Sequence, residues 1–258
     1  MMPEKRLRWH CHPRPDDMPP AAVTGGVAVI IDVLRASTTI VTALANGAAF
    51  VLPTAEIEAA RRFQRELPPG TLLGGERGGV PITGFDLGNS PAEYDLGRVA
   101  GRGIVMTTTN GTAALARCQH AREALIGCLV NRTAVARLAA QLADEATDVH
   151  LVCAGTDGQV TEEDLLGAGA ILDVALTEPI CGLQQLDAAG DQALAAFRRL
   201  TTSGADPTAS LVDAFSRAAG GANLIEIGMA ADLPLAAALD QFALVPRRCA
   251  DTGRLLPR

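Results

Sequence analysis

The chain has 258 residues, of which 48% are hydrophobic and 20% are charged, so it can form one large domain or two small ones around a packed core. Its net charge of −7 argues against a nucleic-acid-binding protein, because such proteins normally carry a basic patch. No apolar run reaches about 18 residues without a polar interruption, so no membrane span is expected.

The first expected element is a strand through His10 and His12, whose side chains alternate onto one face. Two histidines at this spacing can contact a metal, but no matching carboxylate motif accompanies them, so this is the lesser interpretation. Residues 13–20, PRPDDMPP, predict an exposed and turn-rich connection.

Three later segments share one plan: a short apolar run, a loop of small polar residues, and a helix. The predicted strands are 27–31, 104–106 and 149–153, and the helices start near Ser37, at Thr112 and at Glu162. The first helix should end at Asn46–Gly47. Continuous apolar strands that alternate with helices predict an α/β fold, a layered α/β/α sheet that is largely parallel or mixed.

Two stretches do not follow this plan. Residues 74–94 are rich in Gly, Pro, Asn and Asp, and predict a long functional loop. Residues 183–219 predict helices with a break near 201–210. Within a single domain of residues 1–258, the segment from about 183 to 220 is therefore expected to be a helical cap or a second lobe.

Polar residues gather where the predicted strands end. Asp32 can cap a turn or bind Mg²⁺, and both interpretations stay open. Arg35 has a planar fork that suits a phosphate or carboxylate, although a lone Arg is more often a surface ion pair. Ser37 and Thr38 open a helix, where a hydroxyl is a cap and free N–H groups attract anions.

Further candidates lie in the other loops. Thr108, Thr109 and Asn110 offer donors around a turn, although such a run is more often a turn that leads into a helix. Acids in a first helical turn commonly stabilise the helix dipole, and a divalent metal needs only one or two of them. The remaining candidates are Glu76, Arg77, Asn89, Ser90, Glu163 and Asp164. Because ligands of open α/β sheets bind at the carboxyl ends of strands, these residues together predict a site.

Four ordered stretches resemble a known family. They are VAVIIDVLRASTTIVTAL, GGERGG with GFDLGNSPAEY, TTTNGTAAL, and VCAGTDG with EEDLLGAGAI. In this order they resemble the 2-phosphosulfolactate phosphatase family, also called the ComB family, over about residues 27–175. The closing stretch GM with DLPLAAALDQFALVP is similar as well. Between Gly79 and Gly84 the chain has Val-Pro-Ile-Thr, where the family pattern has a charged residue.

The resemblance implies a ComB-like fold that can consist of two similar lobes. It implies a cytoplasmic, Mg²⁺-dependent phosphatase of coenzyme M biosynthesis, which hydrolyses 2-phosphosulfolactate, a small anionic phosphate ester, to 3-sulfolactate and phosphate. A reduced cytoplasmic chain also agrees with six cysteines that include no C-x-x-C pair. A homodimer is compatible with the sequence.

The resemblance also implies roles for the candidates. Asp32 and Arg35 would be catalytic, and Asp32 with one or more of Glu76, Glu163 and Asp164 would hold Mg²⁺. Asp32 as a nucleophile stays open. Arg35 and Arg77 would neutralise the acid groups of the substrate. The neutral donors to the substrate would be Ser37, Thr38, Asn89, Ser90, Thr108, Thr109 and Asn110. The alternatives are a phosphatase acting on another phosphorylated hydroxy acid, and a non-catalytic anion-binding protein.

Overall fold

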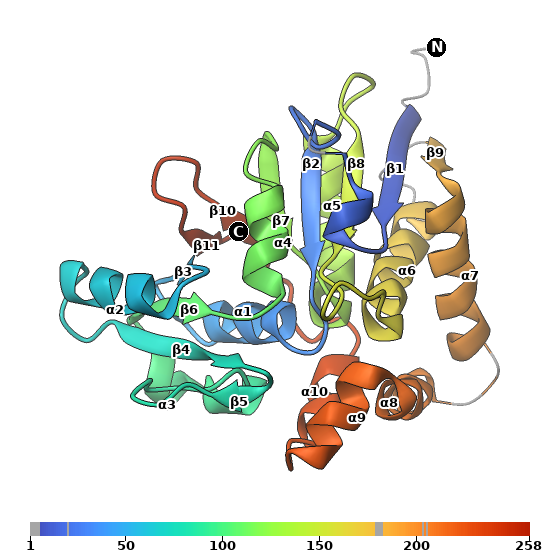
Figure 1. Ribbon diagram of the computed structural model, residues 1–258. Helices are drawn as coiled ribbons and strands as arrows, with labels where there is room; N and C mark the ends of the chain where they lie inside the picture. Colours follow the sequence, from blue (N-terminus) through green and yellow to red (C-terminus); the bar gives the residue numbers. More distant parts are fainter. Residues whose placement is uncertain (1–5, 20, 179–182, 203, 205) are drawn as a thin grey trace.

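The structure is a computed structural model that describes residues 6–19, 21–178, 183–202, 204 and 206–258, so Cys181 lies outside the described residues. In these residues eleven strands form one mixed sheet, in the order β5-β4-β6-β3-β11-β10-β7-β2-β8-β1-β9 (Figure 1). Helices flank the sheet, which confirms the predicted α/β class with a largely parallel or mixed sheet.

The sheet consists of two parallel blocks. One block contains β3 (Phe50–Pro53), β4 (Leu72–Arg77) and β6 (Gly103–Thr107). The other contains β1 (Arg6–His12), β2 (Val27–Ile31), β7 (Glu123–Ile126), β8 (Val149–Cys153) and β9 (Leu183–Leu186). A C-terminal antiparallel hairpin of β10 (Pro246–Arg248) and β11 (Leu255–Pro257) joins the blocks by pairing with β7 and β3.

The central strands are buried along their whole length. Every residue of β2, β6 and β8 is buried, which explains why these segments are mostly apolar and do not alternate between apolar and polar residues. The predicted strands 27–31 and 149–153 are confirmed, and 104–106 extends by one residue at each end. The helices that follow these strands are α1 (Ala36–Ala45), α4 (Gly111–Arg117) and α6 (Glu162–Thr177), close to the predicted starts.

The prediction of a long loop over 74–94 is wrong at its start. Residues 74–77 belong to β4, and β5 (Val80–Pro81) pairs antiparallel with them. Gly74 and Gly75 hide this strand in the sequence, but the close approach of β6 requires glycine. A β-carbon on Gly75 would overlap the carbonyl oxygen of Thr107.

The prediction of helix from 183 onward is wrong for β9, which pairs parallel with β1. The helices α7 (Ala188–Thr201) and α8 (Pro207–Arg217) follow, with a break between them as predicted. The chain continues through α9 (Ala219–Glu226) and α10 (Asp232–Ala237). In Figure 1, helices α8 to α10 lie below the arrowheads of β1 and β2, at the carboxyl ends of the parallel strands.

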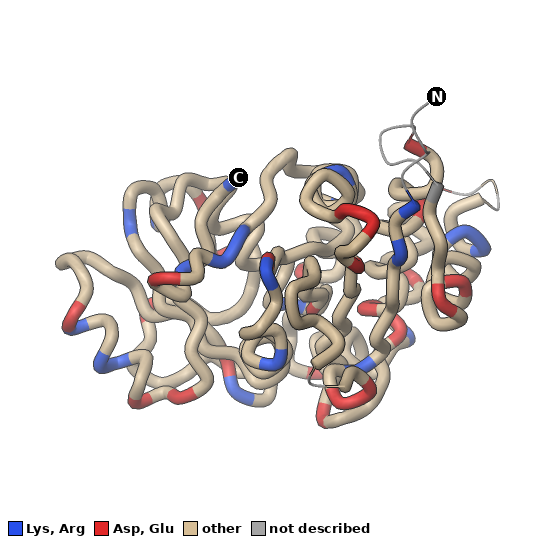
Figure 2. Tube along the Cα trace, turned by 90° about the horizontal axis from the view of Figure 1, so that it is seen from above, with Lys and Arg blue, Asp and Glu red and all other residues tan. Residues whose placement is uncertain are grey.

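The remaining helices are α2 (Ile57–Glu66), α3 (Leu96–Val99), α5 (Arg132–Leu142), η1 (Pro15–Asp17), η2 (Pro91–Glu93) and η3 (Leu129–Asn131). Lys and Arg positions are interspersed with Asp and Glu positions in Figure 2. None of the helices in the described residues combines the length and the apolar character needed to cross a membrane.

Candidate active site

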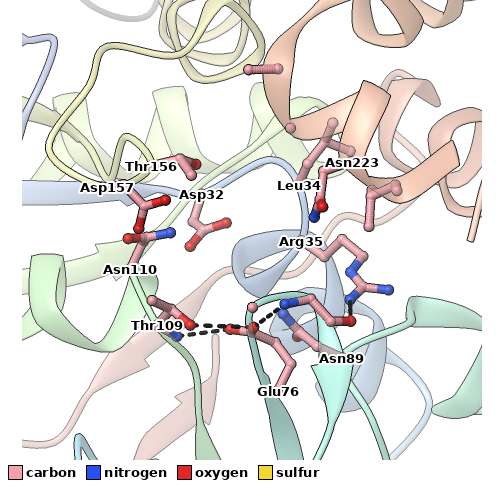
Figure 3. Close-up of a pocket in the computed structure, with 15 residues that line it drawn as sticks. Asp32, Leu34, Arg35, Glu76, Asn89, Thr109, Asn110, Thr156, Asp157 and Asn223 are labelled. Atoms are coloured by element: carbon pink, nitrogen blue, oxygen red, sulfur yellow. Dashed lines mark hydrogen bonds between the residues drawn. The ribbon is translucent and has the colours of Figure 1, made fainter. Parts of the chain in front are cut away.

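A pocket of about 350 Å³ lies where the strand-end loops meet α9 (Figure 3). It is lined from the loop after β2, the end of β4, the loops after β6 and β8, and the start of α9. The lining residues are Asp32, Leu34, Arg35, Glu76, Gly78, Gly79, Asn89, Thr109, Asn110, Thr156, Asp157, Ala219, Gly220, Asn223 and Leu224. The location is the one expected for ligands of an open α/β sheet.

Asp32 stands at the end of β2 with little access to solvent. Its Oδ1 accepts a hydrogen bond from the Ala36 N–H at 3.1 Å, so the turn interpretation is correct for this oxygen. Among the described residues Oδ2 has no hydrogen-bond partner, and Figure 3 shows the carboxylate facing the same space as Asn110 and Asp157. One oxygen thus shapes the turn while the other is available to a ligand.

Three buried acids cluster beside the pocket. Burial, together with the nearby carboxylates of Asp164 and Glu76, raises the pKa of Asp32 to about 8, against the opposing effects of the Ala36 N–H and Arg35. Burial followed by the charge of Asp32 raises the pKa of Glu163 to about 7. Burial and the charge of Glu163 raise the pKa of Asp164 to about 7. Such a cluster is costly to ionise unless a cation is present.

Asp164 and the pocket-lining Glu76 each accept two hydrogen bonds from main-chain N–H groups. Asp164 accepts hydrogen bonds from the N–H groups of Val33 at 2.8 Å and Gly155 at 3.0 Å. Glu76 accepts from the N–H groups of Thr109 at 2.8 Å and Gly79 at 2.7 Å. Both oxygens of each carboxylate are therefore used to fix loops around the pocket.

Glu163 differs from these two acids. Within the part of the chain that the structure describes, its buried Oε2 has no hydrogen-bond partner. The carboxylate lies against the start of α9, because a β-carbon on Gly220 would overlap Glu163 Oε1. A buried carboxylate oxygen without a partner is stabilised by binding a proton or a cation.

The two arginines predicted to bind substrate behave differently. Arg35 lines the pocket, and it also pairs with Asp232 at 2.8 Å and donates to the Gly79 carbonyl at 2.7 Å. Arg77 does not line the pocket. Its guanidinium donates to the main-chain carbonyls of Glu76 and Ala55 and to the Thr107 hydroxyl.

Only some of the predicted neutral donors line the pocket. Thr109 lines the pocket, together with the amides of Asn89 and Asn110. The hydroxyls that do not line it have partners within the protein: Ser37 with Ile30 O and Asp32 N–H, Thr38 with Val33 O, Thr108 with Thr112 N–H, and Ser90 with Asp232. These four hydroxyls stabilise the turns behind the site.

Sequence reasoning missed several lining residues. Thr156 and Asp157 follow β8, and the Gly-Thr-Asp-Gly run was a visible signal for a functional turn. Gly220 and Asn223 come from α9, whose residues show no ligand-binding pattern in the sequence. Asp232 also escaped notice, because its partner Arg35 is 197 residues away.

The donors fit a hard cation such as Mg²⁺, which prefers oxygen ligands and commonly takes only one or two carboxylates. Asp32 Oδ2 is available in the pocket, and Asn89, which also lines the pocket, has a buried Oδ1 with no hydrogen-bond partner among the described residues. In the part of the chain that the structure describes, no group of three or more His, Cys, Asp and Glu side chains is arranged to hold a metal. Water and substrate oxygens would have to complete the coordination.

The three stacked histidines are a separate cluster. His12 and His150 share a hydrogen bond of 3.1 Å between ring nitrogens, and His10 pairs with Asp148 at 3.0 Å. The ring centroids of His10 and His150 are 5.0 Å apart. Because these rings also fall outside any metal-holding group of the described residues, they give no support to the lesser metal interpretation.

Comparison with known proteins agrees with the sequence motifs. A family model described as "2-phosphosulpholactate phosphatase" matches residues 12–250. A "Probable 2-phosphosulfolactate phosphatase" of Deinococcus radiodurans is 46% identical over 232 residues, which cover 89% of this chain and 90% of the relative. Proteins with the same name are 43% identical in Symbiobacterium thermophilum, covering 89% of this chain and 94% of the relative, and 38% identical in Carboxydothermus hydrogenoformans, covering 88% of each.

Proposed function

The chain belongs to the 2-phosphosulfolactate phosphatase family, and from this premise we propose that it is a Mg²⁺-dependent phosphatase that hydrolyses 2-phosphosulfolactate to 3-sulfolactate and phosphate. The observation that carries the metal dependence is the Asp32 carboxylate, buried among acids at the end of β2 with one oxygen free toward the pocket.

The charge of the pocket supports a cation. Among the described residues that line it, Arg35 carries the only positive side chain, against the carboxylates of Asp32, Glu76 and Asp157. The proposed substrate carries a phosphate, a carboxylate and a sulfonate. An anion of this charge enters such a pocket favourably only with a cation that offsets the acids.

Several lining residues have separate tasks in the proposed reaction. Asp32 Oδ2 would hold Mg²⁺, which when bound polarises a phosphoryl oxygen and orients the attacking water. Arg35 offers the guanidinium donors that Asp232 and Gly79 leave unused to an acid group of the substrate. Thr156 and Asn223 line the remaining wall and can donate hydrogen bonds to a sulfonate or carboxylate.

The ionisation of Asp32 is part of the mechanism. A carboxyl group with a pKa of about 8 is mostly protonated at pH 7, and only the ionised form can ligate a metal or attack phosphorus. A cation in the pocket would lower this pKa and so activate Asp32 in either role. The nucleophile in this proposal is either water or Asp32. The homodimer, the cytoplasmic location and the role in coenzyme M biosynthesis stay predictions.

The test is phosphate release from racemic 2-phosphosulfolactate with Mg²⁺ and with EDTA. Wild type should release phosphate only with the metal, and Asp32→Asn should lose this activity. Asp187→Asn is the matched control, because Asp187 also accepts main-chain N–H groups, from Gly190 at 2.7 Å and Cys11 at 3.2 Å, but does not line the pocket.

The same assay addresses the alternatives. If folded wild type releases no phosphate from this ester in the presence of Mg²⁺, the substrate is wrong, and a panel of other phosphorylated hydroxy acids follows. Binding of the esters without release from any of them would show a non-catalytic anion-binding protein.

A further inference from the structure

A buried ion pair joins the pocket to the C-terminal helices. Arg35 Nη1 donates to Asp232 Oδ2 at 2.8 Å, and the two side chains are only 2% and 3% exposed. Arg35 lines the pocket from the loop after β2, whereas Asp232 is the first residue of α10 and does not line it. The pair therefore connects the wall of the pocket to a helix behind it.

Both members of the pair have a second anchor. Ser90 donates its hydroxyl proton to Asp232 Oδ1 at 2.6 Å, and Arg35 Nη2 donates to the Gly79 carbonyl at 2.7 Å. A guanidinium group presents five N–H donors in one rigid plane. Two fixed corners, one on Asp232 and one on Gly79, therefore set the direction of the other donors.

Acids of the pocket lie near this anchor. Arg35 is close enough to Asp32 for its charge to favour the ionised form of that acid, and Glu76 accepts the N–H of Gly79 in the neighbouring turn. Asp232 is the carboxylate that pairs with the guanidinium directly, at 2.8 Å.

We propose that Asp232 is a positioning residue, which orients Arg35 so that the unused guanidinium donors face an anionic group of the substrate. This inference rests on the proposed function for the identity of that anion. Asp232 acts through Arg35, and Ser90 serves the same arrangement by fixing the carboxylate rather than by contacting the substrate.

The first test is Asp232→Asn, which keeps the shape and an acceptor for Ser90 but removes the charge. We expect kcat/KM for 2-phosphosulfolactate with Mg²⁺ to fall on the order of 10²-fold, the effect of a misplaced catalytic group. Asp240→Asn is the matched control. Asp240 accepts from Arg132 Nε at 2.9 Å and from the Thr133 N–H at 2.8 Å, away from the pocket, so this variant should keep the wild-type kcat/KM.

A double-mutant cycle separates positioning from general damage. If Asp232 acts through Arg35, then Arg35→Gln with Asp232→Asn should be no less active than Arg35→Gln alone. Fully additive losses, or a folded Asp232→Asn protein with kcat/KM within twofold of wild type, would overturn the proposal. If Asp232→Asn does not fold, Asp232→Glu replaces it in the cycle. If the Asp232→Glu protein is as stable as wild type, it should still lose turnover, because its carboxylate is displaced. Wild-type turnover in this variant would overturn the positioning role.

Binding of inorganic phosphate in the presence of Mg²⁺, followed by calorimetry, gives a readout that does not need turnover. Wild type that binds phosphate without hydrolysing the ester, with at least tenfold weaker binding in Asp232→Asn, would support positioning while the substrate assignment fails. Wild type that neither hydrolyses the ester nor binds phosphate would overturn both proposals, since Arg35 would then have no anion to meet.

Discussion

Asp164 Oδ1 accepts a hydrogen bond from the main-chain N–H of Val33 at 2.8 Å, so the first turn of α6 holds the residue that follows Asp32. The second oxygen accepts from the Gly155 N–H at 3.0 Å. One buried side chain therefore fixes the loops after β2 and β8 relative to each other, and with them two walls of the pocket.

Removing this side chain should loosen both loops. Asp164→Ala leaves two buried N–H groups without partners, and we expect it to lower the free energy of unfolding by about 2 kcal/mol or more. Phosphatase activity should fall with it, because Asp32 loses its support. Urea unfolding measures the change in the free energy of unfolding. Glu162→Ala, an exposed acid in the same helical turn, is the control and should stay within about 0.5 kcal/mol of wild type.

Asp32→Asn should separate stability from activity. Because the native pKa of Asp32 is raised to about 8, the metal-free native state binds a proton that the unfolded chain releases, and stability falls as pH rises from about 4 to about 8. The variant lacks this proton. We therefore expect its Tm at pH 8 without metal to match or exceed that of wild type, while turnover is lost. Thermal unfolding with EDTA tests this.

Added Mg²⁺ should give wild type a higher Tm than Asp32→Asn. The ion should raise the Tm of wild type and leave Asp32→Asn almost unchanged, since a ligand stabilises only the state that binds it. An equal Tm increase in both proteins would show that Asp32 is not the main ligand.

The stacked histidines should make the protein acid-sensitive. Burial, followed by the charges of His12 and His10, lowers the pKa of His150 to about 4, against the opposing effects of Asp148 and Asp187. The unfolded chain binds a proton that the native state does not, so stability falls as pH decreases from about 6.5 to about 4. His150→Gln should flatten the dependence of Tm on pH over this range. His120→Gln, at an exposed position, should leave the wild-type slope, and a similar flattening in this control would contradict the assignment.

Gly75 tests the close approach of β4 and β6. Its φ is +134°, and a β-carbon would overlap the Thr107 carbonyl oxygen, so Gly75→Ala should destabilise the protein by more than about 3 kcal/mol and disturb Glu76. Gly101→Ala is matched in having a positive φ of +72°, but its β-carbon would meet nothing within 4 Å. It should lose only about 1 kcal/mol. Equal losses in the two variants would show that backbone conformation, not the contact with Thr107, requires glycine.

The sequence predicted elements whose signal is local. The mostly apolar runs at 27–31 and 149–153 match β2 and β8, because burial on both faces favours apolar side chains at most positions, with His150 as the polar exception in β8. The sequence did not predict β4 and β9, because these segments become strands through pairing with neighbouring strands and not through local propensity. Gly74 and Gly75 weaken the propensity of β4, and β9 adds to the sheet edge that β1 presents.

The sequence likewise predicted some residues of the candidate site correctly and others not. Asp32, Arg35, Glu76, Asn89, Thr109 and Asn110 were all named from the sequence and line the pocket. Ser37, Thr38 and Arg77 do not, because main-chain carbonyls nearby accept their protons and no sequence pattern reveals that competition. Asp232 is the opposite case, since only the fold brings it to Arg35.

The C-terminal hairpin lies in the middle of the sheet, between β7 of one parallel block and β3 of the other. Until residues 246–257 pair with them, β7 and β3 therefore present unpaired edges at the centre of the sheet. Removing this hairpin would leave two adhesive edges, one on each parallel block, instead of one shortened strand.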